Sequence, residues 1–180
     1  MTNTNDLLQN AAAYHASFTR GDLPLGAKRK LVVVTCMDAR IDPFALLGLQ
    51  TGDAHILRNA GGVATDDVIR SLAISQHIQQ TTHAMLIHHT DCGMLGLTED
   101  GFRAEIRERS GVTPTWAVEA FTDLEADVRQ SIARIKASPF VPRKEDVHGY
   151  IYDVHDGSLR EVAADPRDAV AAHTAQAASS

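Results

Sequence analysis

The chain has 180 residues, 44% of them hydrophobic, so it is long enough to bury a core of its own as one globular domain. Seventeen Lys and Arg against 23 Asp and Glu give a formal net charge of −6, which offers no electrostatic footprint for nucleic acid or an anionic membrane. The N-terminus lacks a basic segment followed by an apolar stretch, and no apolar run reaches membrane length, so we expect a cytoplasmic protein without membrane or nucleic-acid partners.

The N-terminal part of the sequence predicts a helix, a linker, a strand and a short helix. Apolar side chains recur at helical spacing over residues 6–18, which indicates an amphipathic helix, and the linker GDLPLG follows. LVVVTC is apolar on both faces and predicts a strand in the middle of a sheet. In IDPFALLG, Asp42 as N-cap, Pro43 at the first helical position and Gly48 as terminator predict a short helix.

The next segments continue the alternation of strand and helix. AHILRN predicts a second strand, which the glycines of NAGG end. Thr65 is a good N-cap for a helix that runs to about Gln80, and Asp66 and Asp67 suit the positive end of that helix. AMLIHH predicts a third strand, which stops at TDCGM.

The remainder predicts helix, loop and hairpin. The polar stretch around Phe102 and Ile106 indicates helix and loop, and a clear amphipathic helix follows Thr122, its expected N-cap. YIYDVHDGSLREV alternates around an Asp-Gly turn and predicts a hairpin. Strands that alternate with helices indicate the fold class: α/β, with a mostly parallel central sheet, flanking helices, an N-terminal helical arm and a C-terminal hairpin.

Polar side chains gather where the three predicted parallel strands end: CMDAR after the first, RNAGG after the second and HTDC after the third. Ligands of open parallel sheets bind beyond the carboxyl ends of the strands, so Cys36 meets His89 and Cys92 if the first and third strands are neighbours. Two thiolates and one imidazole form the open, catalytic type of zinc site. We therefore predict zinc bound by these three side chains.

Other side chains compete for the fourth position on the metal. Asp38 is the nearest candidate, and Arg40 can hold it away from the metal through a bidentate ion pair. His88 should point to the opposite face of its strand, and His83 lies back along it, so both are weaker candidates.

Simpler interpretations exist for each residue taken singly. Free cysteines and lone strand histidines are often core residues, Asp38 with Arg40 can be a structural ion pair, and NAGG can be a bare turn. The combination of HxxC at one strand end with the other cysteine at another favours a metal site. A phosphatase-like loop would need arginine in the place of Asp42, and a thioredoxin-like CxxC is absent.

CMDAR followed two strands later by HTDCG resembles the β-class carbonic anhydrases. The resemblance is strongest over Leu31–Leu97, which includes LRNAGG, and is nearest to the small prokaryotic branch of the family. That branch also includes carbonyl sulfide and carbon disulfide hydrolases. The length and the even composition predict one domain over residues 1–180, β-carbonic-anhydrase-like by resemblance, with an N-terminal arm at 1–24, and the Ala-rich, polar tail at 163–180 is expected to fray. The resemblance also implies a homodimer or a multiple of dimers.

The resemblance implies roles for the residues of the site. Cys36, His89 and Cys92 would be the zinc ligands, with Asp38 and Arg40 as the catalytic pair and Asp38 as the fourth ligand in a closed state. The implied activity is reversible hydration of CO2 to bicarbonate and a proton, in which zinc-activated water attacks the substrate carbon.

Two alternatives to this function remain open. One is hydrolysis of carbonyl sulfide or carbon disulfide at the same zinc site, and the other is a zinc-binding interaction module without catalysis. Gly61 and Gly62 are expected to help shape the substrate pocket. The histidines available to carry the proton to solvent are His55, His77 and His83.

Overall fold

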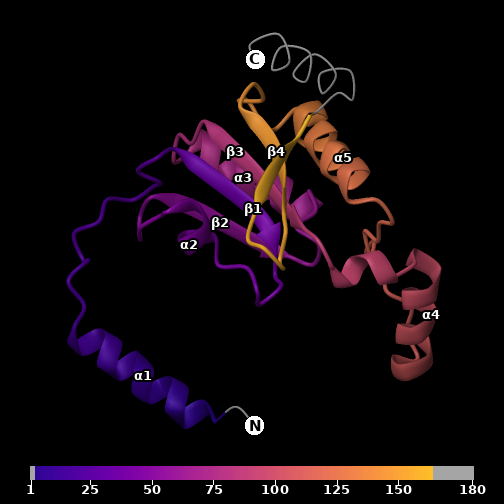
Figure 1. Cartoon of the computed structure of the whole chain (residues 1–180), viewed down its shortest axis with the longest axis horizontal. Helices are drawn as coiled ribbons and strands as arrows, with labels where there is room; N and C mark the ends of the chain where they lie inside the picture. Colours follow the sequence, from indigo (N-terminus) through magenta and orange to yellow (C-terminus); the bar gives the residue numbers. More distant parts are fainter. Residues whose placement is uncertain (1–2, 164–180) are drawn as a thin grey trace.

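The computed structural model of this chain describes residues 3–163, and Figure 1 shows how their elements are arranged. Five strands form one sheet in the order β2-β1-β3-β4-β5. β1 pairs in parallel with β2 and β3, and β3 with β4, whereas β5 runs antiparallel to β4. The predicted mostly parallel sheet and C-terminal hairpin are therefore confirmed. The strands are β1 (Leu31–Cys36), β2 (Ala54–Asn59), β3 (His83–His89), β4 (Val147–Tyr152) and β5 (Leu159–Val162).

Helices flank the sheet on both faces. The apolar sides of α3 and α5 pack on the face that carries Val32, Val34 and Leu86, whereas α2 lies against the face that carries Val33 and Ile87. This division follows from the strand geometry, since successive side chains point to opposite faces and both faces of a central parallel strand are apolar. The helices are α1 (Thr4–Ala16), α2 (Pro43–Leu47), α3 (Asp66–His77), α4 (Glu99–Ser110) and α5 (Leu124–Ala137), with a 3₁₀ turn, η1 (Gly93–Gly96).

The capping residues act as the sequence predicts for α2 and α3. The Asp42 carboxylate accepts hydrogen bonds from the first backbone N–H groups of α2, and Gly48 ends that helix in the left-handed conformation with φ 62°. The Thr65 hydroxyl caps α3 by accepting from the backbone of Val68. These caps fix where the chain turns after β1 and β2.

Two predicted helix boundaries are wrong. Asp123 and not Thr122 caps α5, because its carboxylate accepts a 2.9 Å hydrogen bond from the backbone N–H of Ala126. α3 ends at His77 and not near Gln80, because Gln80 takes a left-handed φ of 59° that no helix continues through. The tail predicted to fray, 163–180, lies outside the described residues apart from Ala163.

Two helices lie apart from the sheet. Figure 1 shows α1 and α4 on opposite sides of the molecule, α1 at the end of an extended segment, and neither helix buries a residue. Between residues 3 and 163, no helix has the length and apolar character needed to cross a membrane. α1 confirms the predicted N-terminal helix, and its apolar side chains stay exposed in the single chain.

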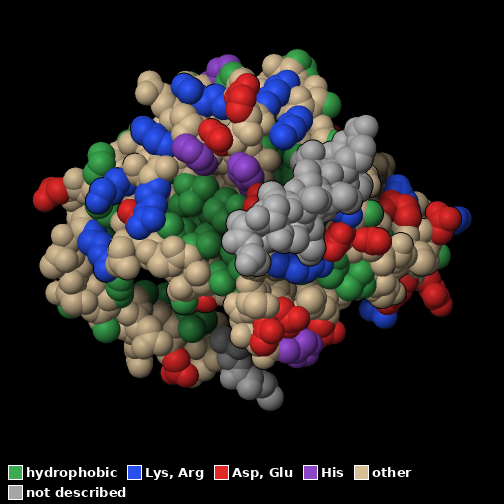
Figure 2. Space-filling view, turned by 45° about the horizontal axis from the view of Figure 1, so that its top comes forward, with side chains coloured by type: hydrophobic (Ala, Val, Ile, Leu, Met, Phe, Trp, Pro, Cys, Tyr) green, Lys and Arg blue, Asp and Glu red, His purple; other side chains and the backbone are tan. Residues whose placement is uncertain are grey.

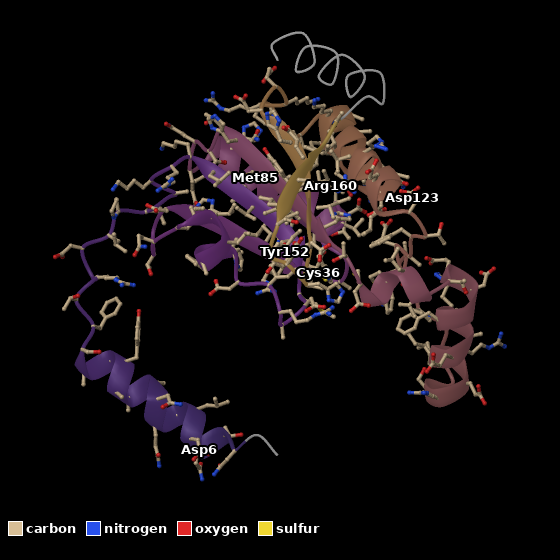
Figure 3. All side chains as sticks on the ribbon, in the orientation of Figure 1. Asp6, Cys36, Met85, Asp123, Tyr152 and Arg160 are labelled. Carbon is tan, nitrogen blue, oxygen red and sulfur yellow. The ribbon has the colours of Figure 1, made fainter. Side chains whose placement is uncertain are left out.

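The sheet brings the ends of its parallel strands to one edge. In the register of the sheet, Cys36 lies beside Asn59, and His89 lies beside Tyr152. Figure 3 labels Cys36 and Tyr152 at this carboxyl edge. The three polar motifs of the sequence therefore meet at one place, as expected for a sheet in which β1 and β3 are neighbours.

Candidate metal centre

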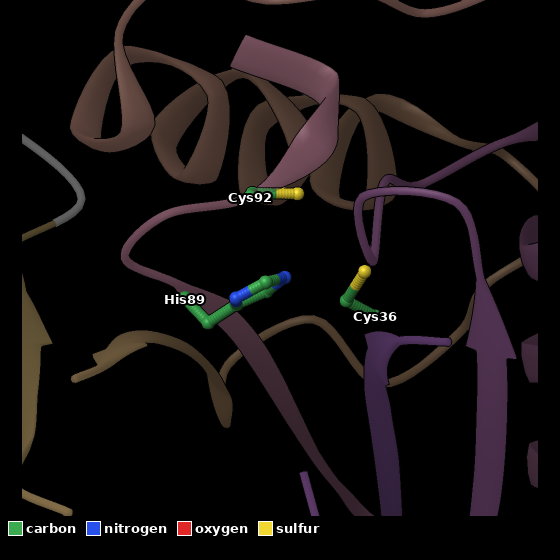
Figure 4. Close-up of side chains that lie close together, drawn as sticks. All are labelled: Cys36, His89 and Cys92. Atoms are coloured by element: carbon green, nitrogen blue, oxygen red, sulfur yellow. The ribbon is translucent and has the colours of Figure 1, made fainter. Parts of the chain in front are cut away.

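Cys36, His89 and Cys92 form one buried cluster. Their two sulfur atoms and one ring nitrogen all lie within 4.8 Å of one another. Figure 4 shows the three side chains pointing toward one another, Cys36 from the end of β1, His89 from the end of β3 and Cys92 just before η1. The structure thus brings together the three residues predicted as ligands.

The orientation of His89 leaves one ring nitrogen for a metal. Its Nδ1–H donates a 2.9 Å hydrogen bond to the backbone carbonyl of Thr90. Its Nε2 is buried and has no hydrogen-bond partner among the described residues. A ligating histidine commonly donates its second N–H to a carbonyl in this way, which fixes the tautomer. The free lone pair and the two sulfur atoms are a donor set that fits Zn²⁺.

The closeness of the two thiols separates their acidities. The neighbouring thiol of Cys92 and the ring of His89 favour the thiolate form of Cys36 and hold its pKa well below its usual range, although burial opposes this shift. The same contact with Cys36, together with burial, raises the pKa of Cys92. A divalent cation bound by both sulfur atoms would favour the thiolate form of both side chains.

His88 has a different role from its neighbour. It points to the opposite face of β3, as predicted, where its Nε2–H donates a 2.6 Å hydrogen bond to the carboxylate of Asp127 on α5. Both side chains are buried. His83 lies at the start of β3, exposed and far along the strand from the cluster. Neither histidine is therefore placed to be the fourth ligand.

Asp38 and Arg40 form the bidentate pair that the sequence predicted. Nε and Nη2 of Arg40 donate to the two carboxylate oxygens of Asp38 over 2.9 and 2.7 Å. These bonds hold the pKa of Asp38 well below its usual range. One Asp38 oxygen lies 3.9 Å from Nε2 of His89, so an ionised carboxylate stands beside the cluster without entering it.

Two residues at the end of β2 hold the backbone between Cys36 and Asp38. Nε of Arg58 donates to the carbonyl of Cys36 over 2.9 Å, and Nη2 donates to the carbonyl of Asp38 over 2.6 Å. The backbone N–H of Met37 donates to the carbonyl of Asn59 over 2.8 Å. The neighbouring strand β2 thereby holds the end of β1 in place. The LRNAGG motif by itself does not predict this role.

The two glycines of NAGG lie against the cluster for steric reasons. A Cβ on Gly62, which has φ 74°, would stand 2.9 Å from the backbone nitrogen of Cys36. A Cβ on Gly61, with φ 84°, would stand 3.0 Å from the ring of Phe121 and 3.3 Å from Met94. Only glycine suits either position, because each needs both a positive φ and a close approach. Phe121 and Met94, with Ile41 and Val63, form an apolar cluster around the two cysteines.

The profile of one protein family matches this part of the chain. The family is described as carbonic anhydrase, and the match covers residues 31–121, from β1 through the cluster to Phe121. β-Carbonic anhydrase 1 of Mycobacterium tuberculosis is 48% identical over 162 residues, which cover 90% of this chain and 99% of that protein. The chain belongs to the β-carbonic anhydrase family.

Other members of the family extend the comparison. The crystal structure of a carbonic anhydrase from Streptococcus mutans superposes with a TM-score of 0.83 at 42% identity, over 91% of this chain and 99% of that one. A carbon disulfide hydrolase of Saccharolobus solfataricus is 32% identical over 74% of this chain and 77% of that protein. The mostly parallel α/β fold is thus that of the β-carbonic anhydrases.

In this member of the family, the three histidines named as proton carriers lie away from the cluster. His55 and His83 stand at the beginnings of β2 and β3, at the sheet edge opposite to the one that carries Cys36. His77 ends α3 and bonds the carbonyl of Phe140. None of the three reaches the metal centre directly, so a proton passing to any of them would need a chain of water molecules.

Proposed function

We propose that this protein catalyses the reversible hydration of CO2 to bicarbonate and a proton. The observation that carries the proposal is the juxtaposition of a buried Cys-His-Cys donor set with an ionised Asp38, held by Arg40, at its edge. A purely structural metal site needs no such carboxylate. Membership of the β-carbonic anhydrase family supports the same function.

Zn²⁺ is the proposed cofactor, held by the side chains of Cys36, His89 and Cys92. Two thiolates and one imidazole leave a tetrahedral ion one open position, which is the arrangement of catalytic zinc sites. Zinc there would supply a Lewis acid that makes water nucleophilic at neutral pH. We further propose that the protein works in the cytoplasm, where reducing conditions keep both thiols free to bind.

Asp38 and Arg40 are the proposed catalytic pair. The Asp38 carboxylate would accept a hydrogen bond from the attacking water and so direct a lone pair of its oxygen at the carbon of CO2. Arg40 keeps that carboxylate ionised and holds both of its oxygens, which opposes its movement onto the metal in a closed state. The apolar cluster that includes Phe121 and Met94 lies beside this place and suits a small, linear, uncharged substrate.

The test is CO2 hydration by stopped flow on the zinc-loaded protein and its Asp38→Ala variant. We expect the variant to retain one zinc per chain and to lose roughly 100- to 10,000-fold in kcat/KM, the range for loss of a positioned proton acceptor. Asp67→Ala, which removes an exposed carboxylate from the first turn of α3, is the matched control. No hydration by the zinc-loaded wild type would reject the proposed function.

The second candidate function is hydrolysis of carbonyl sulfide or carbon disulfide. The relative from Saccharolobus solfataricus, described as a carbon disulfide hydrolase, supports it. The same donor set and the same Asp38–Arg40 pair would serve this reaction. The substrates differ in size because sulfur is larger than oxygen, and a difference of about that size in an apolar pocket changes kcat/KM by about 10- to 200-fold. Measuring kcat/KM for the three substrates on one zinc-loaded preparation decides between them.

We also propose that residues 1–180 form a single domain that assembles as a homodimer or a multiple of dimers. Two apolar surfaces that stay exposed among residues 3–163 support the assembly. α1 exposes Leu7, Leu8 and Tyr14. On the sheet face covered by α2, Met85 and Tyr150 are among the apolar residues left partly buried, and Figure 2 shows apolar side chains gathered at the surface with His, Lys and Arg around them. The helix of one chain packing on the sheet of another would cover both surfaces.

A further inference from the structure

Asp91 is the one residue between the ligands His89 and Cys92 that contacts the Asp38–Arg40 pair. Its carboxylate accepts a 2.8 Å hydrogen bond from Nη1 of Arg40, and its backbone carbonyl accepts a 3.0 Å bond from Nη2. The sequence predicts a role for the histidine and the cysteine of the HTDC motif and none for Asp91. Its position raises the question of what the second carboxylate does to Arg40.

The two carboxylates do not compete for Arg40. Asp38 takes the edge of the guanidinium formed by Nε and Nη2, and Asp91 takes the edge formed by Nη1 and Nη2. Four of the five N–H donors of the group are thus used, each in its own direction. A planar guanidinium held along both edges cannot swing about its long side chain, so the bond to one acid restricts the geometry of the bond to the other.

The backbone of Asp91 is shaped for this contact. Its φ is 55°, in the left-handed region, where Asp, Asn and Gly are the residues commonly found. This turn aims both the carbonyl and the carboxylate of the same residue at Arg40. Thr90 anchors the turn from the other side, because its N–H donates to the carbonyl of Tyr152 and its hydroxyl accepts from the backbone of Val154.

The side chains involved are not deeply buried. Asp91 retains 64% of its side-chain exposure and Arg40 retains 45%. Ion pairs this exposed contribute little to the stability of a fold. These ion pairs can still matter for catalysis by fixing the position of Arg40, because small errors in the placement of a catalytic group reduce the rate strongly even where stability hardly changes.

We propose that Asp91 is a positioning residue, which holds Arg40 in the orientation that presents both oxygens of Asp38 beside the metal centre. This inference rests on the proposed function, since it assigns Asp91 a part in the reaction through Arg40. Its carboxylate and its carbonyl both bond Arg40, and Asp91 is not one of the three proposed ligands. It joins the turn between two ligands to the catalytic pair, so ligands and pair move as one unit.

Two substitutions of Asp91 distinguish the contribution of its carboxylate from that of its left-handed backbone, because both new residues tolerate a positive φ. Asp91→Gly removes the acceptor and keeps the backbone unstrained, whereas Asp91→Asn keeps an oxygen that can accept from Nη1. We expect Asp91→Gly to keep its zinc and its melting temperature and to lose roughly ten- to hundredfold in kcat/KM for CO2, the usual range for residues that orient a metal site. Asp91→Asn should recover most of that loss.

A double substitution tests whether Asp91 acts through Arg40. In an Arg40→Ala background, Asp91→Gly should produce no further loss, because the group that Asp91 positions is already absent. Asp156→Asn is the matched control, because Asp156 is an exposed turn aspartate that accepts from the backbone N–H of Ser158, and its substitution should leave kcat/KM unchanged. Equal losses from Asp91→Gly with and without Arg40, or a loss of zinc from Asp91→Gly, would overturn the proposal.

A measurement independent of activity completes the test. In ¹⁵N NMR spectra of the zinc-loaded protein, the Nη protons of a guanidinium held along both edges should be resolved, and Arg40→Lys identifies them by their disappearance. We expect Asp91→Gly to broaden these signals and Asp91→Asn to keep them. Unchanged Arg40 signals in Asp91→Gly would overturn the proposal. If the wild type hydrates no CO2 but its Arg40 signals respond as expected, the proposed function fails while the positioning contact stands.

Discussion

At the scale of single residues, Cys92 is the sharpest test of the metal centre. Cys92→Ser replaces a thiolate by a weakly acidic hydroxyl, which removes a negative charge and a zinc bond together. We expect the zinc affinity to fall by more than roughly a hundredfold, because changes to the mere hydrogen-bond partners of ligands already cost about ten- to hundredfold. Metal analysis after dialysis against a zinc buffer measures the loss, and one zinc per chain in the variant would reject the assignment.

His88 provides the control for that experiment. His88→Ala should keep its zinc, because the ring bonds Asp127 on the far side of β3. It should nevertheless lower the free energy of unfolding by about 2 to 4 kcal/mol, since it leaves a cavity and a buried carboxylate without its donor. Denaturant unfolding measures this cost. The two adjacent histidines would then have different roles, because His89 binds the metal whereas His88 binds Asp127 of α5.

The residues of the site differ in how far the sequence could predict them. Cys36, His89 and Cys92 were predictable, because strand ends of a parallel sheet converge and the three donor types suit zinc. The roles of Arg58 and Asp91 were not. Arg58 reaches the carbonyls of the neighbouring strand only because β2 lies beside β1, and Asp91 reaches Arg40 only because its turn is left-handed. Strand order is a property of the tertiary fold and the left-handed turn is a backbone conformation, and the motifs specify neither.

At the scale of elements, the loop after β2 supports the end of β1. Gly62→Ala would place a Cβ against the backbone of Thr35 and Cys36, so β1 or the loop would have to shift. Gly157→Ala is the matched control, because Gly157 has a similar φ of 78° but open space around its Cβ position. We expect Gly62→Ala to cost about 1 to 3 kcal/mol more than the control in denaturant unfolding. Equal costs would mean that the close approach is unimportant.

A second element-scale contact joins the starts of two strands. The Asp53 carboxylate, just before β2, accepts from the backbone of Gln50 and from Arg29, which precedes β1. The bond from Gln50 and the charge of Arg29 lower the pKa of Asp53. A carboxyl whose pKa is lowered by folding stabilises the fold above its unfolded pKa of about 3.9, and this contribution disappears as the pH falls through the folded value.

The Asp53→Asn variant tests this linkage. We expect it to melt below the wild type at pH 7, and the difference in melting temperature should narrow as the pH falls below about 4, because the carboxyl of the unfolded wild type binds a proton there and the folded carboxylate follows only at lower pH. Thermal unfolding at a series of pH values measures the difference. Asp22→Asn, which changes an exposed aspartate in the linker after α1, is the control and should leave the melting temperature unchanged at pH 7. A constant difference in melting temperature between the two proteins from pH 7 to pH 3 would contradict the assignment of this stabilisation to the charge of Asp53.

The boundaries of the elements show where local signals suffice. α2 was predictable from end to end, because Asp42, Pro43 and Gly48 each favour one position of a helix. The start of α5 was not, because Thr122 and Asp123 are both capping residues in adjacent places and only the final backbone path decides between them. The error is one residue, yet it changes which side chain bonds the helix.

At the scale of the whole molecule, α1 tests the proposed dimer. Leu8→Glu places a charge on its exposed apolar side, whereas Gln9→Glu places the same charge on the next residue, which helical geometry turns away. We expect Leu8→Glu to raise the Kd of the dimer at least about tenfold, since a buried leucine contributes about 1.5 to 3 kcal/mol. Sedimentation velocity measures both variants. A monomeric wild type, or equal effects of the two charges, would reject this interface.

The bond between His88 and Asp127 bears on the order in which the molecule is made. All three proposed ligands are synthesised before α5, because Cys92 precedes Asp127 in the chain. At that moment β3 lacks both its neighbour β4 and the helix that covers its buried face. A nascent chain thus carries the donor atoms well before it can hold them rigidly, so tight metal capture belongs to the last stage of biosynthesis.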